Sequence, residues 1–101
     1  RQSAPEQALT LAEKASELAP ESADVLYTLA LAASANGDNA RAALSIRRAV
    51  MKAPQRADYQ YHQALILLAQ KKTEGAITAL EELLARETAF AERDEAVQNP
   101  G

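Results

Sequence analysis

Residues able to perform catalysis or bind a metal are few in this sequence. The chain has one histidine, His62, and no cysteine. His62 lies between Tyr61 and Gln63 in a segment with helical spacing, where a lone histidine favours a structural role over a catalytic one. The sequence also has no glycine-rich phosphate loop and no set of residues suited to holding a metal. We therefore expect no catalytic residue, no cofactor and no metal site.

Two pairs of identical polar residues have the same spacing between their members. Asp24 and Asp58 are 34 residues apart, and so are Tyr27 and Tyr61. Each aspartate comes near an expected helix start, where its charge complements the helix dipole without any acid–base role. A tyrosine offers rigid contact area with a polar tip. These pairs indicate a repeated structural unit that presents surface for contact.

The same interval of 34 residues relates most of the chain to itself. Alanine recurs at Ala8, Ala42 and Ala76, and again at Ala30 and Ala64. Two antiparallel helices approach closely only where side chains are small. The repeating alanines therefore predict helix–helix contacts at these positions. Apolar residues between them recur at steps of three and four, which is typical of amphipathic helices.

On these residues the chain resembles the tetratricopeptide repeat family, whose repeat has this length. The resemblance covers nearly everything from Pro5 to Phe90. It implies an all-α fold, a right-handed α-solenoid of antiparallel helix pairs. We expect about two full repeats, a leading half repeat and a short C-terminal helix. No stretch alternates with period two, so we expect no strands.

In this register the chain divides into four parts. We expect the second helix of an incomplete repeat over 1–19, one repeat over 20–55 and another over 56–88. A short C-terminal helix and a disordered tail are expected over 89–101. A chain of 101 residues that begins with Arg1 and has no signal peptide is interpreted as a piece of a longer protein.

Helix boundaries follow from local residue types. Ser3, Ser22 and Asp38 are expected to cap the helices that follow them. Gly37 suits the left-handed backbone that closes a helix. One repeat later, Lys71 and Lys72 stand in the corresponding turn, which must close without glycine; Thr73 is the expected cap of the next helix.

The second repeat departs from the family pattern at Gln60 and Gln63. The corresponding residues of the first repeat are Leu26 and Leu29. A buried glutamine must find hydrogen-bond partners or lose about 1–3 kcal/mol. One interpretation is that these amides lie at the edge of the core, or that Tyr59 fills the space instead. The other is that they contact a partner or a neighbouring repeat.

The resemblance further implies that the first helix of each repeat lines a concave groove that binds a peptide or helix of a partner protein. Tyr27 and Tyr61 are expected to stack there as a ladder. Chaperone-binding members hold a terminal carboxylate with lysine and asparagine, which this groove lacks, so we do not expect chaperone tails as ligands. The groove sites by register are Asp24, Tyr27, Leu31, Ser34, Asp58, Tyr61, Leu65 and Leu68.

The first helix has an apolar side that the register places between two neighbouring helices. With only one neighbour present, that side is expected to associate with another copy or to receive a further repeat. The sequence therefore predicts that the chain can form a homo-oligomer through this helix. The self-association face consists of Leu9, Leu11, Ala12, Ala15 and Leu18.

Charge and hydropathy argue against nucleic acid as a partner and against insertion into a membrane. The net charge is −3, which argues against nucleic acid as a general partner. No apolar run approaches the roughly 20 residues that span a membrane. Five basic residues without an acid lie between Arg41 and Arg56. They are interpreted as a solvated convex face with ion pairs to neighbouring helices, with a weak anion-binding patch as the alternative.

We therefore expect a non-enzymatic module that binds a partner protein within a larger assembly. The alternative is a structural spacer or self-association segment of a longer array without a ligand of its own. A third hypothesis is that the parent protein is an enzyme that carries this module as an appended domain. Tyr61-His62, Leu83-Leu84 and the run from Phe90 to Arg93 also resemble the closing module of bacterial envelope repeat proteins. Such proteins are periplasmic or lipid-anchored scaffolds of exopolysaccharide export, which favours the periplasm over the cytoplasm.

Overall fold

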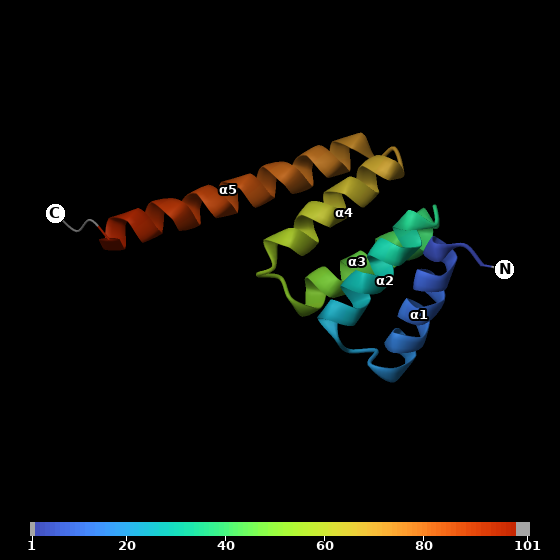
Figure 1. The fold of residues 1–101 in the computed structure, drawn as a ribbon. Helices are drawn as coiled ribbons and strands as arrows, with labels where there is room; N and C mark the ends of the chain where they lie inside the picture. Colours follow the sequence, from blue (N-terminus) through green and yellow to red (C-terminus); the bar gives the residue numbers. More distant parts are fainter. Residues whose placement is uncertain (1, 99–101) are drawn as a thin grey trace.

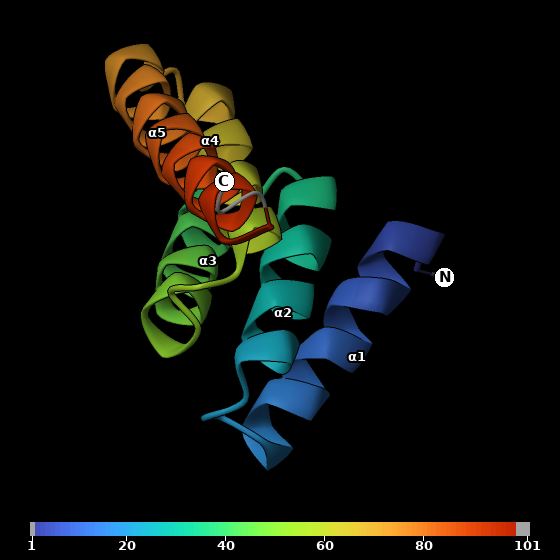
Figure 2. The ribbon, with the colours of Figure 1, turned by 90° about the vertical axis from the view of Figure 1, so that its left-hand side faces the viewer.

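The computed structural model describes residues 2–98, which form five α-helices joined by short turns (Figure 1). Each helix packs against the next one along the chain, and Figure 2 shows α1 and α2 side by side. The described residues contain no strand, so the chain is a helical solenoid in which contacts are mainly between neighbours. The helices are α1 (Ala4–Leu18), α2 (Ala23–Ala35), α3 (Asn39–Lys52), α4 (Ala57–Ala69) and α5 (Thr73–Gln98).

The first three helices begin at the caps that the sequence predicts. The side chain of Ser3 accepts a hydrogen bond from the backbone N–H of Glu6 at the start of α1. Ser22 and Asp38 do the same for α2 and α3. Each cap satisfies one backbone donor that has no partner inside the helix. Thr73 differs from its prediction, because it is the first residue of α5 and not the cap before it.

The turns after α2 and α4 have the same hydrogen-bond pattern. The N–H of Gly37 donates to Ser34 and that of Asp38 to Ala33; Lys71 and Lys72 donate to Leu68 and Leu67 in the same way. Such a pair of backbone hydrogen bonds ends a helix when one residue adopts the left-handed backbone conformation. Gly37 has φ of 76° and Lys71 has φ of 63°. The second turn therefore closes without glycine by holding a lysine in a conformation that glycine adopts more easily.

These two turns give a reciprocal prediction. A Cβ added at Gly37 would have no heavy atom within 4 Å, so Gly37→Ala should cost only the backbone strain, about 1 kcal/mol of unfolding free energy. Lys71→Gly should relieve that strain and stabilise the protein by up to about 1 kcal/mol. Urea denaturation measures both. A Lys71→Gly variant less stable than the parent would contradict this account of the turn.

The core is built largely from alanine. Ala42 and Ala76 are fully buried, as are Ala30 and Ala64. Their small side chains let the helix backbones approach closely, which confirms these predicted contacts. Ala8 is a correction: it is exposed, because α1 packs chiefly on α2 and that contact does not cover Ala8.

The C-terminal helix is longer than predicted. The sequence predicts one helix that ends near residue 88 and a short second one after it, whereas α5 continues from Thr73 to Gln98. The stretch from Arg86 to Gln98 contains neither proline nor glycine, so no residue in it stops a helix. Figure 1 shows α5 running back along α4 and extending well past the N-terminal end of α4.

This extension gives the molecule its shape, with principal extents of 63 × 30 × 21 Å and a radius of gyration of 16.2 Å. A compact domain of this length would have a radius nearer 13 Å. No helix among residues 2–98 is both long and apolar enough to cross a membrane.

Candidate functional site

A cluster of three rings joins α2 to α4. Tyr27 of α2 stacks on Tyr59 of α4, with ring centroids 4.4 Å apart and planes inclined by 22°. The ring of His62 meets Tyr27 edge-on at 5.3 Å. The expected ladder of Tyr27 and Tyr61 is therefore wrong. Tyr59 and Tyr61 are two residues apart and project from different sides of α4, so only Tyr59 faces α2.

His62 is held by two polar contacts of its Nδ1 atom. The hydroxyl of Tyr27 lies 2.8 Å from Nδ1, and the backbone oxygen of Asp58 lies 3.0 Å from it. With a proton on Nδ1 the ring donates to the Asp58 carbonyl; without one it accepts from the Tyr27 hydroxyl. The first bond lies within α4, whereas the second links α4 to Tyr27 of α2. The structural role expected for His62 stays a prediction.

An arginine ties both aspartates to this ring cluster. Arg56 donates to both carboxylate oxygens of Asp58, over 3.0 and 2.8 Å, and lies 3.4 Å from a carboxylate oxygen of Asp24. Its guanidinium also lies 4.4 Å from the centre of the Tyr59 ring. The Tyr59 hydroxyl donates to Asp24. The two aspartates thus hold the Arg56 guanidinium and the Tyr59 hydroxyl in place between the repeats, in addition to the helix-dipole role expected from the sequence.

Burial and these hydrogen bonds shift the pKa values of the cluster. Burial raises the pKa of Tyr59 to about 12, and its hydrogen bond to Asp24 adds to the effect. Burial, followed by the nearby charge of Asp58, also raises the pKa of Tyr27. The hydrogen bonds from Arg56 lower the pKa of the Asp58 carboxyl. The cluster therefore favours neutral tyrosines and an ionised Asp58.

The raised pKa of Tyr59 predicts an alkaline loss of stability. Tyr59 ionises near pH 10.0 in the unfolded chain and near pH 12 in the folded one. The contribution of its neutral hydroxyl to the free energy of unfolding is therefore complete below pH 10 and falls as the pH rises toward 12. Tyr59→Phe should remove about 1–2 kcal/mol of this fall. Urea denaturation across that pH range measures it. Tyr61→Phe, which removes an exposed hydroxyl, is the matched control, and an equal effect of both variants would contradict the assignment.

Beside the ring cluster, α4 presents a stripe of large exposed apolar side chains. Tyr61, Leu65 and Leu68 are 49%, 40% and 42% exposed. Their spacing of four and three residues places them on one side of the helix. Leu31 and Ser34 of α2 are half-buried. We call the eight predicted groove residues, four from α2 and four from α4, the α2–α4 face. Only the α4 members expose much apolar area.

The predicted self-association residues of α1 do not share one environment. Leu9 packs against the hydrophobic core and Ala12 is buried, so these two already lie in an intramolecular contact. Ala15 is half-buried. Leu11 and Leu18 are 67% and 88% exposed. Leu9 and Ala12 are three residues apart and share the side of α1 that contacts the rest of the chain. Leu11 and Leu18 are seven residues apart and share another side, which explains the division.

A second polar network fixes α5 to the turn between α3 and α4. Arg86 of α5 donates to the backbone oxygen of Pro54 over 2.8 Å and to the side-chain oxygen of Gln60 over 2.6 Å. The amide nitrogen of Gln60 donates to the same Pro54 oxygen over 2.9 Å. Gln60 thus has partners at the edge of the core, and Tyr59 is fully buried, as the first reading of these sites expected.

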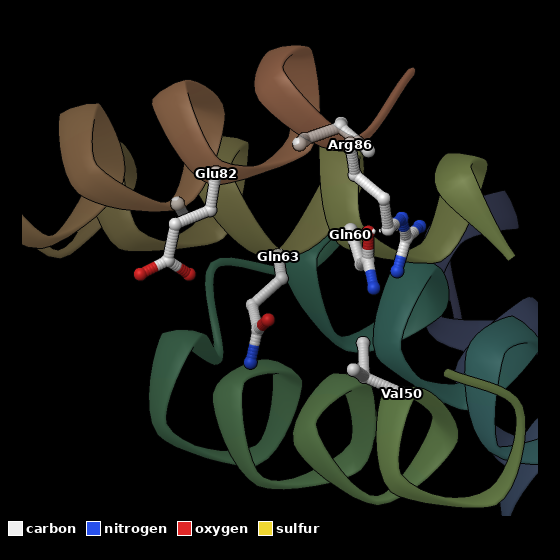
Figure 3. A pocket seen from close by; sticks show the side chains of 7 residues that line it. Val50, Gln60, Gln63, Glu82 and Arg86 are labelled. Carbon is white, nitrogen blue, oxygen red and sulfur yellow. Dashed lines mark hydrogen bonds between the residues drawn. The ribbon is translucent and has the colours of Figure 1, made fainter. Parts of the chain in front are cut away.

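The sequence does not indicate Arg86 as a partner of Gln60, because the two residues are 26 positions apart and share no repeat position. The two residues nevertheless lie together in the structure (Figure 3). No group of three His, Cys, Asp or Glu side chains among the described residues is placed to hold a metal ion.

Paired antiparallel helices stacked in sequence order define a helical repeat protein. The tetratricopeptide repeat family matches residues 1–55 and 27–92, two overlapping segments that together cover most of the chain. The chain belongs to the tetratricopeptide repeat family, whose repeats are typically non-catalytic scaffolds for protein–protein interaction. A search of curated proteins finds no match to this chain.

Proposed function

We propose that the α2–α4 face binds a peptide or helix of a partner protein. The observation that supports this most is the exposed stripe of Tyr61, Leu65 and Leu68 on α4. Large apolar side chains gathered on one side of a helix are more typical of an interaction surface than of a solvated one. Tyrosine and leucine suit the apolar side of an amphipathic helix laid along the stripe.

The ring cluster supports this proposal by fixing the backbone that presents the stripe. Tyr59 and His62 contact Tyr27 on one side of α4, while Tyr61 lies edge-on to His62 at 5.6 Å. A surface whose supporting side chains are already ordered loses less conformational entropy when a partner binds. The exposed residues Tyr61, Leu65 and Leu68 are thus presented by a helix that the ring cluster holds in place.

The test replaces the stripe without disturbing the rings beneath it. Tyr61→Ala, Leu65→Ala and Leu68→Ala together should weaken binding of a purified partner at least about tenfold. Calorimetry measures the affinity and circular dichroism the helicity. Tyr27 is left in place, because its removal would unstack Tyr59.

The matched control replaces exposed apolar residues of another helix. Leu44→Ala and Met51→Ala change large exposed side chains of α3 and should leave affinity unchanged. Equal weakening by both sets would contradict the proposed face. Binding unaffected by either set would place the partner on another surface, whereas no binding of any partner by the parent chain would favour a structural spacer. The resemblance of the segment from Tyr61 to Arg93 to envelope proteins makes periplasmic components of exopolysaccharide export the first partners to test.

A second proposed function is association through α1. The exposures of Leu11 and Leu18 support it, because such side chains at 67% and 88% exposure leave apolar area in contact with water. The occupant would be another copy or a further repeat. Leu9 and Ala12 take no part, since α1 already uses them to contact the rest of the chain.

Sedimentation at increasing concentration tests this second function. We expect the parent chain to self-associate and a Leu11→Glu, Leu18→Glu variant to stay monomeric, because a charge buried in an apolar contact is costly. Met51→Glu on α3 is the control for adding an exposed acid. A monomeric parent that behaves like the variant at all concentrations would contradict self-association.

A further inference from the structure

The side of α5 that corresponds to the covered side of α3 is open to solvent. On α3, Ala43 and Val50 are half-buried and pack against the hydrophobic core. Each lines a cavity that Gln63 of α4 also lines, so this side of α3 faces α4. The residues 34 positions later, Ile77 and Leu84 of α5, are 48% and 65% exposed. Among residues 2–98, no helix takes the place beside α5 that α4 takes beside α3.

This open side of α5 continues onto α4. Tyr61 is the counterpart of Tyr27, which α4 covers by stacking Tyr59 on it. Leu65 follows Tyr61 by four residues on the same side of α4 and is also exposed. Because a helix covers the corresponding residues of the first repeat, a helix laid along α4 and α5 is the ligand that fits this surface. We call it the end face, and it consists of Tyr61, Leu65, Ile77 and Leu84.

At the other end of the row of helices, α1 has an exposed apolar side of its own (Figure 1). Leu11 and Leu18 are seven residues apart and strongly exposed. The residues at alternating intervals of four and three along this side are all alanine or leucine. That spacing is typical of a helix that packs lengthwise against another helix. We call this the outer side of α1, and it consists of Ala4, Ala8, Leu11, Ala15 and Leu18.

The charged residues on these two surfaces have opposite signs. Lys14 comes three residues after Leu11 and therefore lies along the outer side of α1. Glu74 and Glu81 come three residues before and four residues after Ile77, so they lie along the end face. All three charged residues are exposed. The outer side of α1 laid on the end face therefore brings a cation to two carboxylates.

We propose that the outer side of α1 of one copy packs on the end face of another copy. This inference rests on the second proposed function, association through α1, and identifies the surface that receives α1. The two surfaces lie at opposite ends of the row of helices (Figure 2), so copies join head to tail. One helix covers less area than a standard interface, so we expect a dissociation constant on the order of 10–100 μM.

The end face overlaps the α2–α4 face at Tyr61 and Leu65. A helix of a partner protein bound on the α2–α4 face and α1 of another copy would therefore compete for these two side chains. Ile77 and Leu84 belong to the end face alone. Variants at these two residues thus test the contact between copies and leave the α2–α4 face intact.

Two double variants, each with one damaged surface, test the contact. Leu11→Glu with Leu18→Glu places charges on the outer side of α1, and Ile77→Glu with Leu84→Glu places them on the end face. All four residues are exposed, so circular dichroism should show unchanged helicity. At concentrations where the parent chain associates, each double variant alone should sediment as a monomer. Their equimolar mixture should form a dimer and nothing larger, because it contains one intact copy of each surface.

Matched variants separate this contact from a general effect of charge. Ala40→Glu with Met51→Glu adds two acids at exposed positions of α3 and should associate as the parent does. Lys14→Glu should weaken association about threefold or more, because it replaces attraction to two carboxylates by repulsion. Arg48→Glu makes the same change of charge on α3 and should have little effect.

Three results would overturn the proposal. The first is association of either double variant by itself; if the end-face variant associates and the α1 variant does not, association through α1 stands but its partner is another surface. The second is a mixture of the two double variants that stays monomeric although the parent associates. The third is a parent chain that is monomeric at all concentrations, which would also contradict the second proposed function.

Discussion

The contact between the two repeats depends on the burial of a single aromatic ring. Tyr59 is fully buried and is the largest such side chain in the core. It stacks on Tyr27, donates to Asp24 and lies under the guanidinium of Arg56. A ring of this size contributes much more buried apolar area than the alanines around it. In a solenoid, each such interface between neighbours contributes directly to the stability of the whole array.

The ion pairs around this ring contribute mainly by orientation. Arg56 and its partners Asp24 and Asp58 are substantially exposed, so solvent screens their attraction and each pair adds little stability. The bidentate contact with Asp58 nevertheless fixes the guanidinium over the Tyr59 ring. The same ring cluster sets the rotation of α4 about its axis. That rotation decides which residues of α4 reach solvent.

Polar residues on an adjacent side of α4 have a different consequence. In the first repeat, Leu26 and Leu29 are buried, whereas their counterparts Gln60 and Gln63 are half-buried. Amides must keep hydrogen-bond partners, so they remain at the edge of the core and do not fill it. The bond from Arg86 to Gln60 replaces part of the missing apolar contact. One consequence of this exchange is the open space between α3, α4 and α5.

Local sequence determined the helices, the repeat length, the caps of α1 to α3 and the left-handed turn at Gly37, because these depend on residues a few positions apart. It also indicated that Lys71 must close a turn without glycine. Only the tertiary structure decided that Tyr59, and not Tyr61, stacks on Tyr27, since that choice depends on the rotation of α4. The division of the α1 face, the exposure of Ala8 and the pairing of Arg86 with Gln60 likewise depend on how whole helices pack.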